Sequence, residues 1–335
     1  MNLPQRISLL VRLGQYLLGQ EASWLAAKER AEQQNGWFTQ PFIDHAVQHI
    51  AQRWLTREVL EQWAAGGQVP LERNNPKKIG IVMAGNIPLV GFHDWLSVFI
   101  SGHWALVKLS SKDAVLLPHL FEKMASWDPA CIPYTKVVEK LTEAEVFIAT
   151  GSNNSSRYFS YYFGKYPHII RKNRTAAALL TGKESTSELE GLADDIHLYF
   201  GMGCRNVTKL YVPIGYDFIP LLEALKKYAY LSDHHKYKNN YDYQLALHIL
   251  NKNYYMTNGT ILLVENPSLF APISQLHYEY YQAPGEVLAL LRAHPDLQCL
   301  TGTSTLPFGS SQHPAIDDYA DGVNTLVFLN KEMLN

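Results

Sequence analysis

The chain has 335 residues, of which 47% are hydrophobic, 12% aromatic and 18% charged. This composition is typical of a globular protein, and the length is sufficient for two domains with substantial cores. The formal net charge is −2, and the lysines and arginines are scattered along the chain. A nucleic-acid-binding groove would need a basic stripe, so we expect no nucleic-acid partner.

The three cysteines, Cys131, Cys204 and Cys299, are odd in number and far apart. Their spacing fits neither a disulfide framework nor a metal site, and we expect neither. The first residues do not resemble a signal peptide, and no run approaches the roughly 20 apolar residues that span a bilayer. We therefore expect a reduced, cytoplasmic protein without a membrane span.

Apolar periodicity predicts helices over about the first 70 residues, followed by short β-rich runs that alternate with amphipathic stretches. This alternation favours parallel sheets covered by helices on both faces, with a domain boundary near residue 190. The predicted strands are residues 78–83, 105–109, 145–149, 176–180, 207–212, 260–264 and 325–329. The predicted helices include residues 7–18, 46–65, 93–100, 115–126, 216–228 and 242–250.

Small polar residues follow three of the predicted strands. Asn86 lies in the turn at 84–88, Lys108, Ser110 and Ser111 lie at 107–113, and Gly151 and Ser152 lie at 150–154. The carboxyl ends of parallel strands are where such sheets bind ligands, and free N–H groups before a helix attract anions. Each turn also has a plainer interpretation as a helix start, with Asn86, with Ser111 or Asp113, or with the residues at 150–154 as caps.

The order of these turns, followed by Gly201-Met202-Gly203-Cys204, resembles the aldehyde dehydrogenase superfamily. More closely, the chain resembles the long-chain acyl-CoA (fatty acyl) reductases of bacterial bioluminescence. The resemblance implies an α/β fold with two α/β domains, parallel sheets and a helical N-terminal region. It divides the chain into a helical region at 1–75 packed on the cofactor domain, a Rossmann-like cofactor-binding domain at 76–190 and a catalytic domain at 191–335.

The resemblance also implies roles for single residues. Cys204 matches the catalytic cysteine, and Asn86 matches the asparagine whose amide helps to form the oxyanion hole. Lys108 matches the lysine that contacts the adenosine ribose. Gly151 and Ser152 match the turn that lies against the adenosine and pyrophosphate of the cofactor.

Three further expectations concern the chemistry. Hydrolytic aldehyde dehydrogenases carry a water-activating glutamate in a Glu-Leu-Gly-Gly-Lys stretch, and Leu179 stands in its place when 179–183 is matched to that stretch. Glu184, Glu188 and Glu190 remain candidates for a replacement base, as do Glu279 and Glu286 for a contact to the nicotinamide ribose. The hydroxyls of Ser110 and Ser111, with lysines nearby, suit the 2′-phosphate of NADPH.

We therefore predict an NADPH-dependent reductase that converts an acyl-CoA or another acyl thioester to the aldehyde through an acyl-cysteine. The alternatives are a cysteine-dependent acyltransferase or thioesterase, with His197 or His168 as base, and a non-catalytic nucleotide-binding protein of the same fold. A homo-oligomer or an acyl-donor protein partner is compatible with the sequence. The aromatic run at 157–163 is interpreted as a helix packed on the sheet rather than an acyl tunnel, and His234-His235 as a helix start rather than a metal site.

Overall fold

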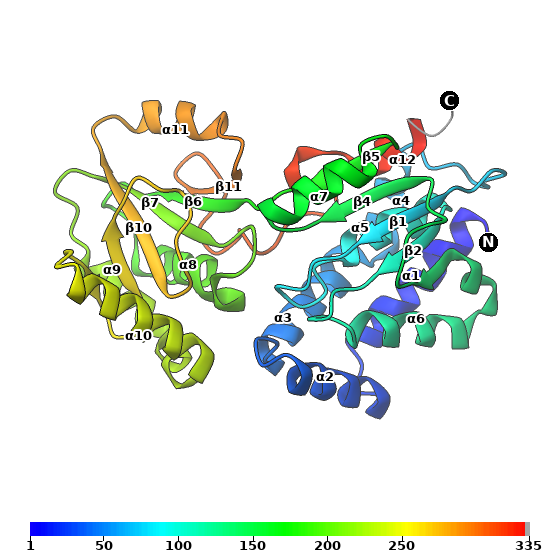
Figure 1. Cartoon of the computed structure of the whole chain (residues 1–335), viewed down its shortest axis with the longest axis horizontal. Helices are drawn as coiled ribbons and strands as arrows, with labels where there is room; N and C mark the ends of the chain where they lie inside the picture. The colour runs from blue at the N-terminus through cyan, green and yellow to red at the C-terminus, as the bar shows by residue number, and fades with distance from the viewer. Residues whose placement is uncertain (332–335) are drawn as a thin grey trace. The chain divides into compact units, whose positions relative to one another are not determined.

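The computed structural model describes residues 1–331, which form two compact units (Figure 1). Unit 1 comprises Met1–Asn173 together with the chain from Ala315 onward, and unit 2 comprises Arg174–Pro314. The division therefore falls earlier than the predicted boundary near residue 190. The reason is that strand β6, Thr175–Leu179, pairs with two strands of unit 2.

The sheet of unit 1 has five parallel strands in the order β3-β2-β1-β4-β5. Three of these strands were predicted, whereas the short edge strands β3 and β5 were not. The central strand, β1, pairs Ile79 with Ala105 on one side and with Val146 on the other. The strands are β1 Lys78–Val82, β2 Trp104–Lys108, β3 Thr135–Val137, β4 Val146–Thr150 and β5 His168–Arg171.

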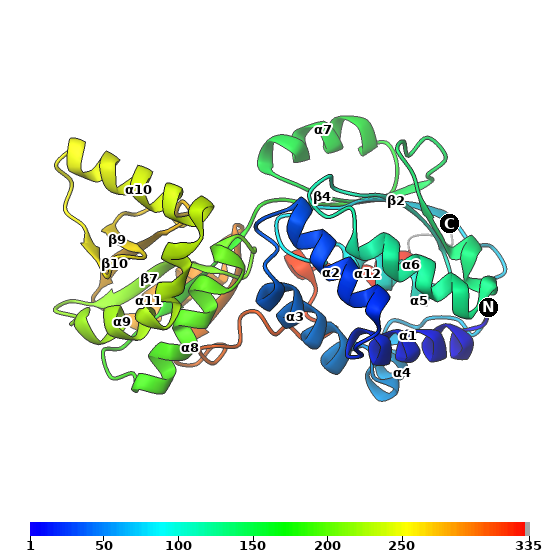
Figure 2. The same cartoon turned by 90° about the horizontal axis from the view of Figure 1, so that it is seen from below.

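Helices cover both faces of this sheet, with α7 on one side and most of the others on the opposite side (Figure 2). The N-terminal helices share one hydrophobic core with the strands, to which Leu10, Leu13 and Ile81 contribute. The helices of unit 1 are α1 Leu3–Leu17, α2 Ala22–Gln34, α3 Gln40–His49, η1 Ile50–Trp54, α4 Arg57–Gly66, α5 Phe92–Ser101, α6 Leu116–Trp127, η2 Pro129–Tyr134, α7 Asn153–Phe163, η5 Ala320–Gly322 and α12 Thr325–Lys331.

Several of these helices bear directly on predictions. The aromatic run lies in α7, where Phe163 stacks on Phe147 of β4 with ring centroids 4.1 Å apart, so a helix packed on the sheet is confirmed. Packing does not account for the whole run, because Tyr158, Tyr161 and Tyr162 are exposed. The predicted helix at 46–65 is interrupted between η1 and α4. Thr56 begins a new helix there because its side chain accepts the N–H of Val59.

The predicted strand at 325–329 is wrong, because these residues form helix α12. Its β-branched and aromatic residues favour a strand, but tertiary packing overrides that preference. Asn324 accepts the N–H of Val327 at 2.9 Å at the start of the helix. Leu326 and Leu329, three residues apart, are fully buried on the same helix face, and α12 packs against α5.

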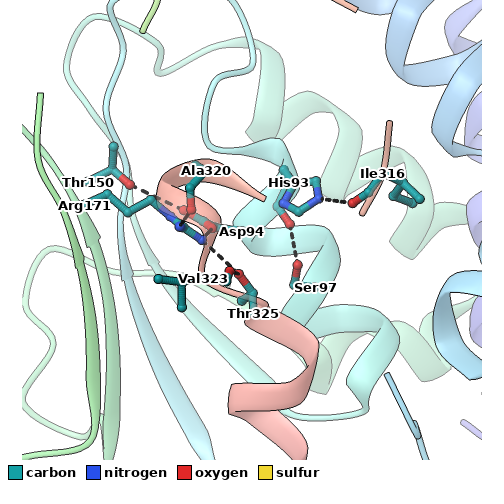
Figure 3. Close-up of polar contacts among 9 residues, drawn as sticks. All are labelled: His93, Asp94, Ser97, Thr150, Arg171, Ile316, Ala320, Val323 and Thr325. Atoms are coloured by element: carbon teal, nitrogen blue, oxygen red, sulfur yellow. Dashed lines mark hydrogen bonds and ion pairs between the residues drawn. The ribbon is translucent and has the colours of Figure 1, made fainter. Parts of the chain in front are cut away.

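A buried polar network attaches the returning C-terminal segment to unit 1 (Figure 3). The Arg171 guanidinium pairs with Asp94 at 2.9 Å, and these side chains are 4% and 10% exposed. The same guanidinium donates to the carbonyl of Ala320 at 2.5 Å and to the hydroxyl of Thr325 at 2.8 Å. The end of β5, the start of α5 and the segment at 320–325 are therefore held at one point.

Unit 2 contains a six-stranded sheet in the order β11-β6-β7-β10-β9-β8, parallel except between β8 and β9. Helix α11 covers one face, and α8, α9 and α10 lie on the other (Figure 1). The elements besides β6 are β7 Val207–Pro213, β8 Met256–Thr257, β9 Leu262–Glu265, β10 Gln275–Tyr281, β11 Leu297–Gly302, α8 Thr186–His197, η3 Leu198–Gly201, α9 Ile219–Ala224, η4 Leu225–Asp233, α10 His235–Leu250 and α11 Pro284–Arg292.

The residues just before the predicted boundary near 190 form the start of helix α8. Ser185 accepts the N–H of Glu188, and the Glu188 side chain accepts the N–H of Ser185, which together form a capping box at the start of α8. His234 likewise begins α10, because its side chain accepts the N–H of Tyr237, so the helix-start interpretation of His234-His235 is confirmed. Within residues 1–331, no helix is both long enough and apolar enough to span a membrane.

Candidate functional site

The three predicted turns lie at one edge of the sheet of unit 1. Strands β2, β1 and β4 are adjacent and parallel, so their carboxyl ends share that edge. The six predicted site residues other than Cys204 all belong to these turns. The fold therefore brings together Asn86, Lys108, Ser110, Ser111, Gly151 and Ser152 as strand-end residues of unit 1, whereas Cys204 belongs to unit 2.

The loop that carries Asn86 joins β1 to α5 and is packed closely against the turn after β2. A Cβ atom on Gly85 would lie 2.6 Å from the Ser110 hydroxyl oxygen, so only glycine fits there. Leu89 is buried and has a φ of 57°, a left-handed conformation that L-residues seldom adopt. Asn86 does not cap α5, since the residue before that helix is Gly91.

The turn after β2 exposes Lys108, Ser111 and Lys112. The Ser110 hydroxyl instead accepts the N–H of Lys112 at 3.2 Å and so shapes the turn. Neither Ser111 nor Asp113 caps α6, because that helix starts after Val115 without a side-chain hydrogen bond.

Asp113 is directed inward from this turn. Its Oδ2 accepts the N–H of Leu89 at 2.9 Å, and its side chain is 4% exposed. Burial raises the pKa of the Asp113 carboxyl to about 6, while the hydrogen bond from Leu89 opposes that rise. Sequence reasoning considered Asp113 only as a helix cap. The sequence did indicate its position, because Asp113 follows the end of a buried strand. It therefore lies at the same edge of the sheet as the candidate site residues.

The turn after β4 is both tight and exposed. A Cβ atom on Gly151 would lie 2.9 Å from both Ser155 and Phe159, which explains the glycine. Ser152 accepts the N–H of Ser155 at 3.2 Å and caps α7, so the cap interpretation is correct for this residue. Because Ser152, Asn153 and Asn154 are exposed, the start of α7 can present N–H groups to an anion.

These three turns fit a nucleotide with a pyrophosphate. The start of α7 offers N–H donors, and Lys108 and Lys112 offer positive charge at the same edge. Among residues 1–331, no group of three or more His, Cys, Asp or Glu side chains is placed to bind a metal ion.

Cys204 is half-buried in the loop that leads into β7. The loop begins with three successive left-handed residues, Tyr199 with φ 54°, Phe200 with φ 57° and Gly201 with φ 73°. Such a conformation costs an L-residue about 1–2 kcal/mol. Strain of this kind persists only where the surroundings enforce it, and it is frequent at active sites.

Asn206 provides that enforcement and was missed by sequence reasoning. It is fully buried, and its Oδ1 accepts the N–H of Gly203 at 2.7 Å. Its Nδ2 donates to the carbonyls of Leu198 at 2.9 Å and Asp195 at 3.0 Å. One side-chain amide therefore joins the end of α8 to the residue before the cysteine. The sequence could have indicated this role, because Asn206 lies two residues after Cys204 and directly before a β-rich run.

Leu179 does not occupy the place of a water-activating base, and this expectation was wrong. Leu179 pairs with Tyr211, whereas Ala176 pairs with Val207 at the start of β7. Cys204 precedes Val207, so it lies at the opposite end of the strand. With a rise of about 3.3 Å per residue, Leu179 lies roughly 13 Å beyond the level of Val207.

The part of β6 beside the Cys204 loop is its first residues. The Thr175 hydroxyl donates to the carbonyl of Asn206 at 3.1 Å, and the N–H of Ala176 donates to the same carbonyl at 3.0 Å. No Asp or Glu occurs between residues 168 and 183, a stretch that spans β5, β6 and the connection between them. Neither the segment that leads into β6 nor β6 itself can thus supply a carboxylate base.

The glutamates considered as replacement bases have other partners or are exposed. Glu184 accepts the hydroxyl of Thr181 at 2.8 Å and the N–H of Gly182 at 3.0 Å. Glu188 belongs to the capping box of α8. Glu190 is exposed on the same helix.

Of the two candidates for a contact to the nicotinamide ribose, Glu279 lies in β10 and pairs with the buried Lys209 at 2.9 Å. Glu286 is exposed in the first turn of α11.

The two histidines proposed as bases for a thioesterase differ in position. His197 is 1% exposed, its Nδ1 donates to the carbonyl of Ala193 at 3.1 Å, and its ring stacks on Tyr228. Burial lowers the pKa of His197 to about 4, and its Nε2 is buried, where a substrate has no access. His168 lies in β5 of unit 1, with Nδ1 bonded to the carbonyl of Tyr166 at 2.8 Å.

No protein-family model and no curated protein sequence matches the chain. The fold is nevertheless similar to that of solved aldehyde dehydrogenases. An NAD-dependent aldehyde dehydrogenase from Sinorhizobium meliloti superposes with a TM-score of 0.68 at 14% identity, over 95% of this chain and 73% of that chain.

Two further structures agree with this likeness. A mutant of aldehyde dehydrogenase C from Pseudomonas syringae, complexed with NAD+ and octanal, gives a TM-score of 0.65 at 11% identity, over 90% of this chain and 72% of that chain. An NADP dependent enzyme from E. coli gives 0.65 at 12% identity, over 90% and 73%. The chain therefore has the aldehyde dehydrogenase fold, with α/β units and parallel sheets.

Proposed function

We propose that the protein is an NADPH-dependent reductase that converts an acyl-CoA, or another acyl thioester, to the aldehyde with Cys204 as nucleophile. The observation that carries this proposal is the pairing of a strained cysteine loop with a neighbouring strand that lacks any acid. A hydrolytic dehydrogenase needs a base to activate water against its acyl-enzyme. An acyl-cysteine without such a base persists long enough to accept hydride.

The chain's own residues account for the acyl-transfer steps. The Cys204 thiolate attacks the thioester carbon, and the electron pair of the carbonyl moves onto its oxygen. Collapse of this oxyanion expels the thiolate of coenzyme A and leaves an acyl-cysteine. Within unit 2 the Cys204 N–H is the proposed donor to the oxyanion, and the family resemblance assigns the same role to the Asn86 amide. The loss of one such donor typically costs about 3–4 kcal/mol.

When bound, a nicotinamide cofactor would supply the hydride that reduces the acyl-cysteine. Cys204 then leaves as thiolate while the aldehyde is released, which restores the enzyme. Among the structural neighbours, one is complexed with NAD+ and octanal and another is an NADP dependent enzyme. Both support a nicotinamide cofactor, and the first also supports an aldehyde as a reactant of this fold.

The choice of NADPH is supported by the turn after β2. Lys108, Ser111 and Lys112 are exposed there without an acidic neighbour that is also exposed, since Asp113 is directed inward. Enzymes that prefer NAD often place an acid at the ribose 2′-hydroxyl. We therefore expect Ser111→Glu to weaken the preference for NADPH over NADH at least tenfold, with Ser111→Gln as the size-matched control. An unchanged preference in Ser111→Glu would contradict this assignment.

The central test is consumption of NADPH with acyl-CoAs of increasing chain length, followed by absorbance and by detection of the aldehyde. Cys204→Ala should abolish consumption, whereas Cys299→Ala, at the other half-buried cysteine of unit 2, should retain it. Consumption that survives in Cys204→Ala would exclude the mechanism. Release of free coenzyme A without NADPH would favour the acyltransferase or thioesterase alternative.

A further inference from the structure

A buried carboxylate in unit 1 has no assigned role in the proposed reaction. Asp113 uses one oxygen to accept the N–H of Leu89, and its other oxygen, Oδ1, is buried without a hydrogen-bond partner among the described residues. Buried acids are normally paired with a cation or fully hydrogen-bonded. The Asp113 carboxylate accepts only one hydrogen bond from the described residues, so its presence in the interior needs an explanation.

The position of Asp113 relative to Asn86 offers one. Gly85, on one side of Asn86, packs against Ser110 so closely that a Cβ would lie 2.6 Å from its hydroxyl. Leu89, three residues beyond Asn86, bonds to Asp113 at 2.9 Å. Both ends of the segment that carries Asn86 are thus held by the turn at 110–113. The left-handed φ of Leu89 shows that this segment is held in a conformation it would not adopt by itself.

A neutral asparagine could accept the same N–H without the cost of burying a charge. An ionised acceptor, however, makes the stronger hydrogen bond. Natural proteins retain destabilising groups mainly where function needs them. The geometry thus favours a role in which the charge of the Asp113 carboxylate holds the loop firmly.

We propose that Asp113 is a positioning residue for the proposed reduction, whose ionised carboxylate fixes the loop at 84–91 and with it the amide of Asn86. Protonation of this carboxylate loosens the loop. The inference rests on the proposed function for its catalytic consequence, but the fixing of the loop can be measured independently of activity.

The surroundings of Asp113 make its titration simple to interpret. The loop at 84–91 that faces it contains no titratable side chain. On its own turn, Lys108 and Lys112 are exposed, and the carbonyl of Lys112 accepts the amide of Asn35 at 3.0 Å. Burial raises the pKa of Asp113 to about 6, so the carboxylate is protonated as the pH falls through that value. The hydrogen bond from Leu89 favours the ionised form, so protonation weakens this bond while Asp113 stays buried, whereas burial itself favours the protonated form and stabilises the fold as a whole.

The first arm of the test is a pH profile of kcat for the wild type, Asp113→Asn and Asp113→Ala with NADPH and an acyl-CoA. In the wild type kcat should fall as the pH decreases through about 6. At pH 7.5 both variants should lose between ten- and a hundredfold in kcat, because small displacements of catalytic groups have effects of that size. KM for NADPH should change less than threefold, and the step near pH 6 should disappear in Asp113→Asn.

Asp128→Asn is the matched control. Like Asp113, Asp128 accepts a backbone N–H, in this case that of Ala130 at 3.0 Å, but it lies away from the strand ends that carry the site. Its profile should match the wild type. A wild-type kcat and pH profile in Asp113→Asn would overturn the proposal. Should Asp113→Ala fail to fold, Asp113→Asn still decides, because it keeps an acceptor for Leu89 and removes the charge.

The second arm is hydrogen exchange of the peptide that covers residues 84–92 in the protein without ligands. In the wild type its protection, corrected for intrinsic exchange, should decrease at least fivefold from pH 7.5 to pH 5.5. In Asp113→Asn protection should be lower at pH 7.5 and independent of pH. If the wild type reduces no acyl thioester, the proposed function fails. The exchange data still decide whether Asp113 fixes the loop, and equal protection in wild type and Asp113→Asn would overturn that claim.

Discussion

The loop that carries Cys204 and the loop that carries Asn86 are both held by one buried side chain, but the two anchors differ chemically. Asn206 is neutral, and it both accepts and donates hydrogen bonds around the cysteine loop. Asp113 is ionisable, accepts one hydrogen bond and leaves one oxygen unpartnered among the described residues. The cysteine loop contains three left-handed residues, whereas the loop of Asn86 contains only Leu89 between residues 83 and 91.

This difference indicates how each loop should respond to its surroundings. An amide anchor holds the cysteine loop equally well across the accessible pH range. A buried carboxylate anchor makes the other loop sensitive to pH, because its charge state changes near neutrality. The following predictions test this contrast, beginning with the largest expected effect.

Replacement of Asn206 by alanine should have the largest effect on stability. The change leaves the N–H of Gly203 and the carbonyls of Leu198 and Asp195 without their partner in the interior, at about 2–4 kcal/mol in the free energy of unfolding. Urea unfolding at pH 7 and pH 5.5 measures this loss, which should be the same at both pH values. Asn253→Ala, exposed after α10, should change stability by less than about 0.5 kcal/mol.

The stability of Asp113→Asn relative to the wild type should depend on pH. Because the pKa of Asp113 is raised from 3.8 to about 6, the folded protein binds more protons than the unfolded chain between these values. The wild type therefore loses stability as the pH rises from about 4 to about 6, by up to about 3 kcal/mol. Asp113→Asn lacks this loss, so its free energy of unfolding should increase relative to that of the wild type as the pH rises over the same range. Parallel stability curves would show that the carboxylate is not buried in solution.

An added methyl group at Gly85 should strain the contact between the two turns of unit 1. Gly85→Ala places a Cβ 2.6 Å from the Ser110 hydroxyl and 2.7 Å from its Cβ, and overpacking of this kind costs about 1–3 kcal/mol. Ser110→Gly in the same chain removes both atoms and should restore most of the loss. Thermal unfolding of the two single variants and the double variant measures the coupling, and strict additivity would contradict the contact.

The smallest effect is expected at the third turn of unit 1. Ser152→Ala removes the cap of α7 and should lower stability by about 1 kcal/mol. Ser187→Ala, at an exposed position inside α8, serves as control and should be neutral or slightly stabilising, because alanine favours helices. A larger loss in the control than in Ser152→Ala would contradict the capping role.

The elements that the sequence predicts well are those whose local pattern agrees with their tertiary environment. Strands β1, β2 and β4 are short apolar runs that end in turn residues, and their adjacency makes the three predicted turns neighbours. β10 was missed because its polar side chains are buried and bonded to one another. Gln275 bonds to both His248 and His277 at 2.9 and 2.8 Å, a pairing invisible to hydrophobic periodicity.

The failures at the candidate site have equally specific causes. Matching Leu179 to a base ignored strand register, which only the pairing of β6 with β7 reveals. Asn206 and Asp113 were not identified as anchors because their partners are backbone groups, which no pattern of side chains in the sequence reveals. The strand-like composition of residues 325–329 was misleading because burial of Leu326 and Leu329 requires a helix.

The network around Arg171 has a consequence for the order in which the protein is made. Unit 2 is an insertion between Asn173 and Ala315, so all of its residues leave the ribosome before the last segment of unit 1. Until that segment is synthesised, the Arg171–Asp94 pair lacks Ala320 and Thr325. We therefore expect unit 2 to fold first during synthesis and unit 1 to close around its C-terminal helix last. A chain released after residue 314 should accordingly contain a folded unit 2 beside a protease-sensitive unit 1.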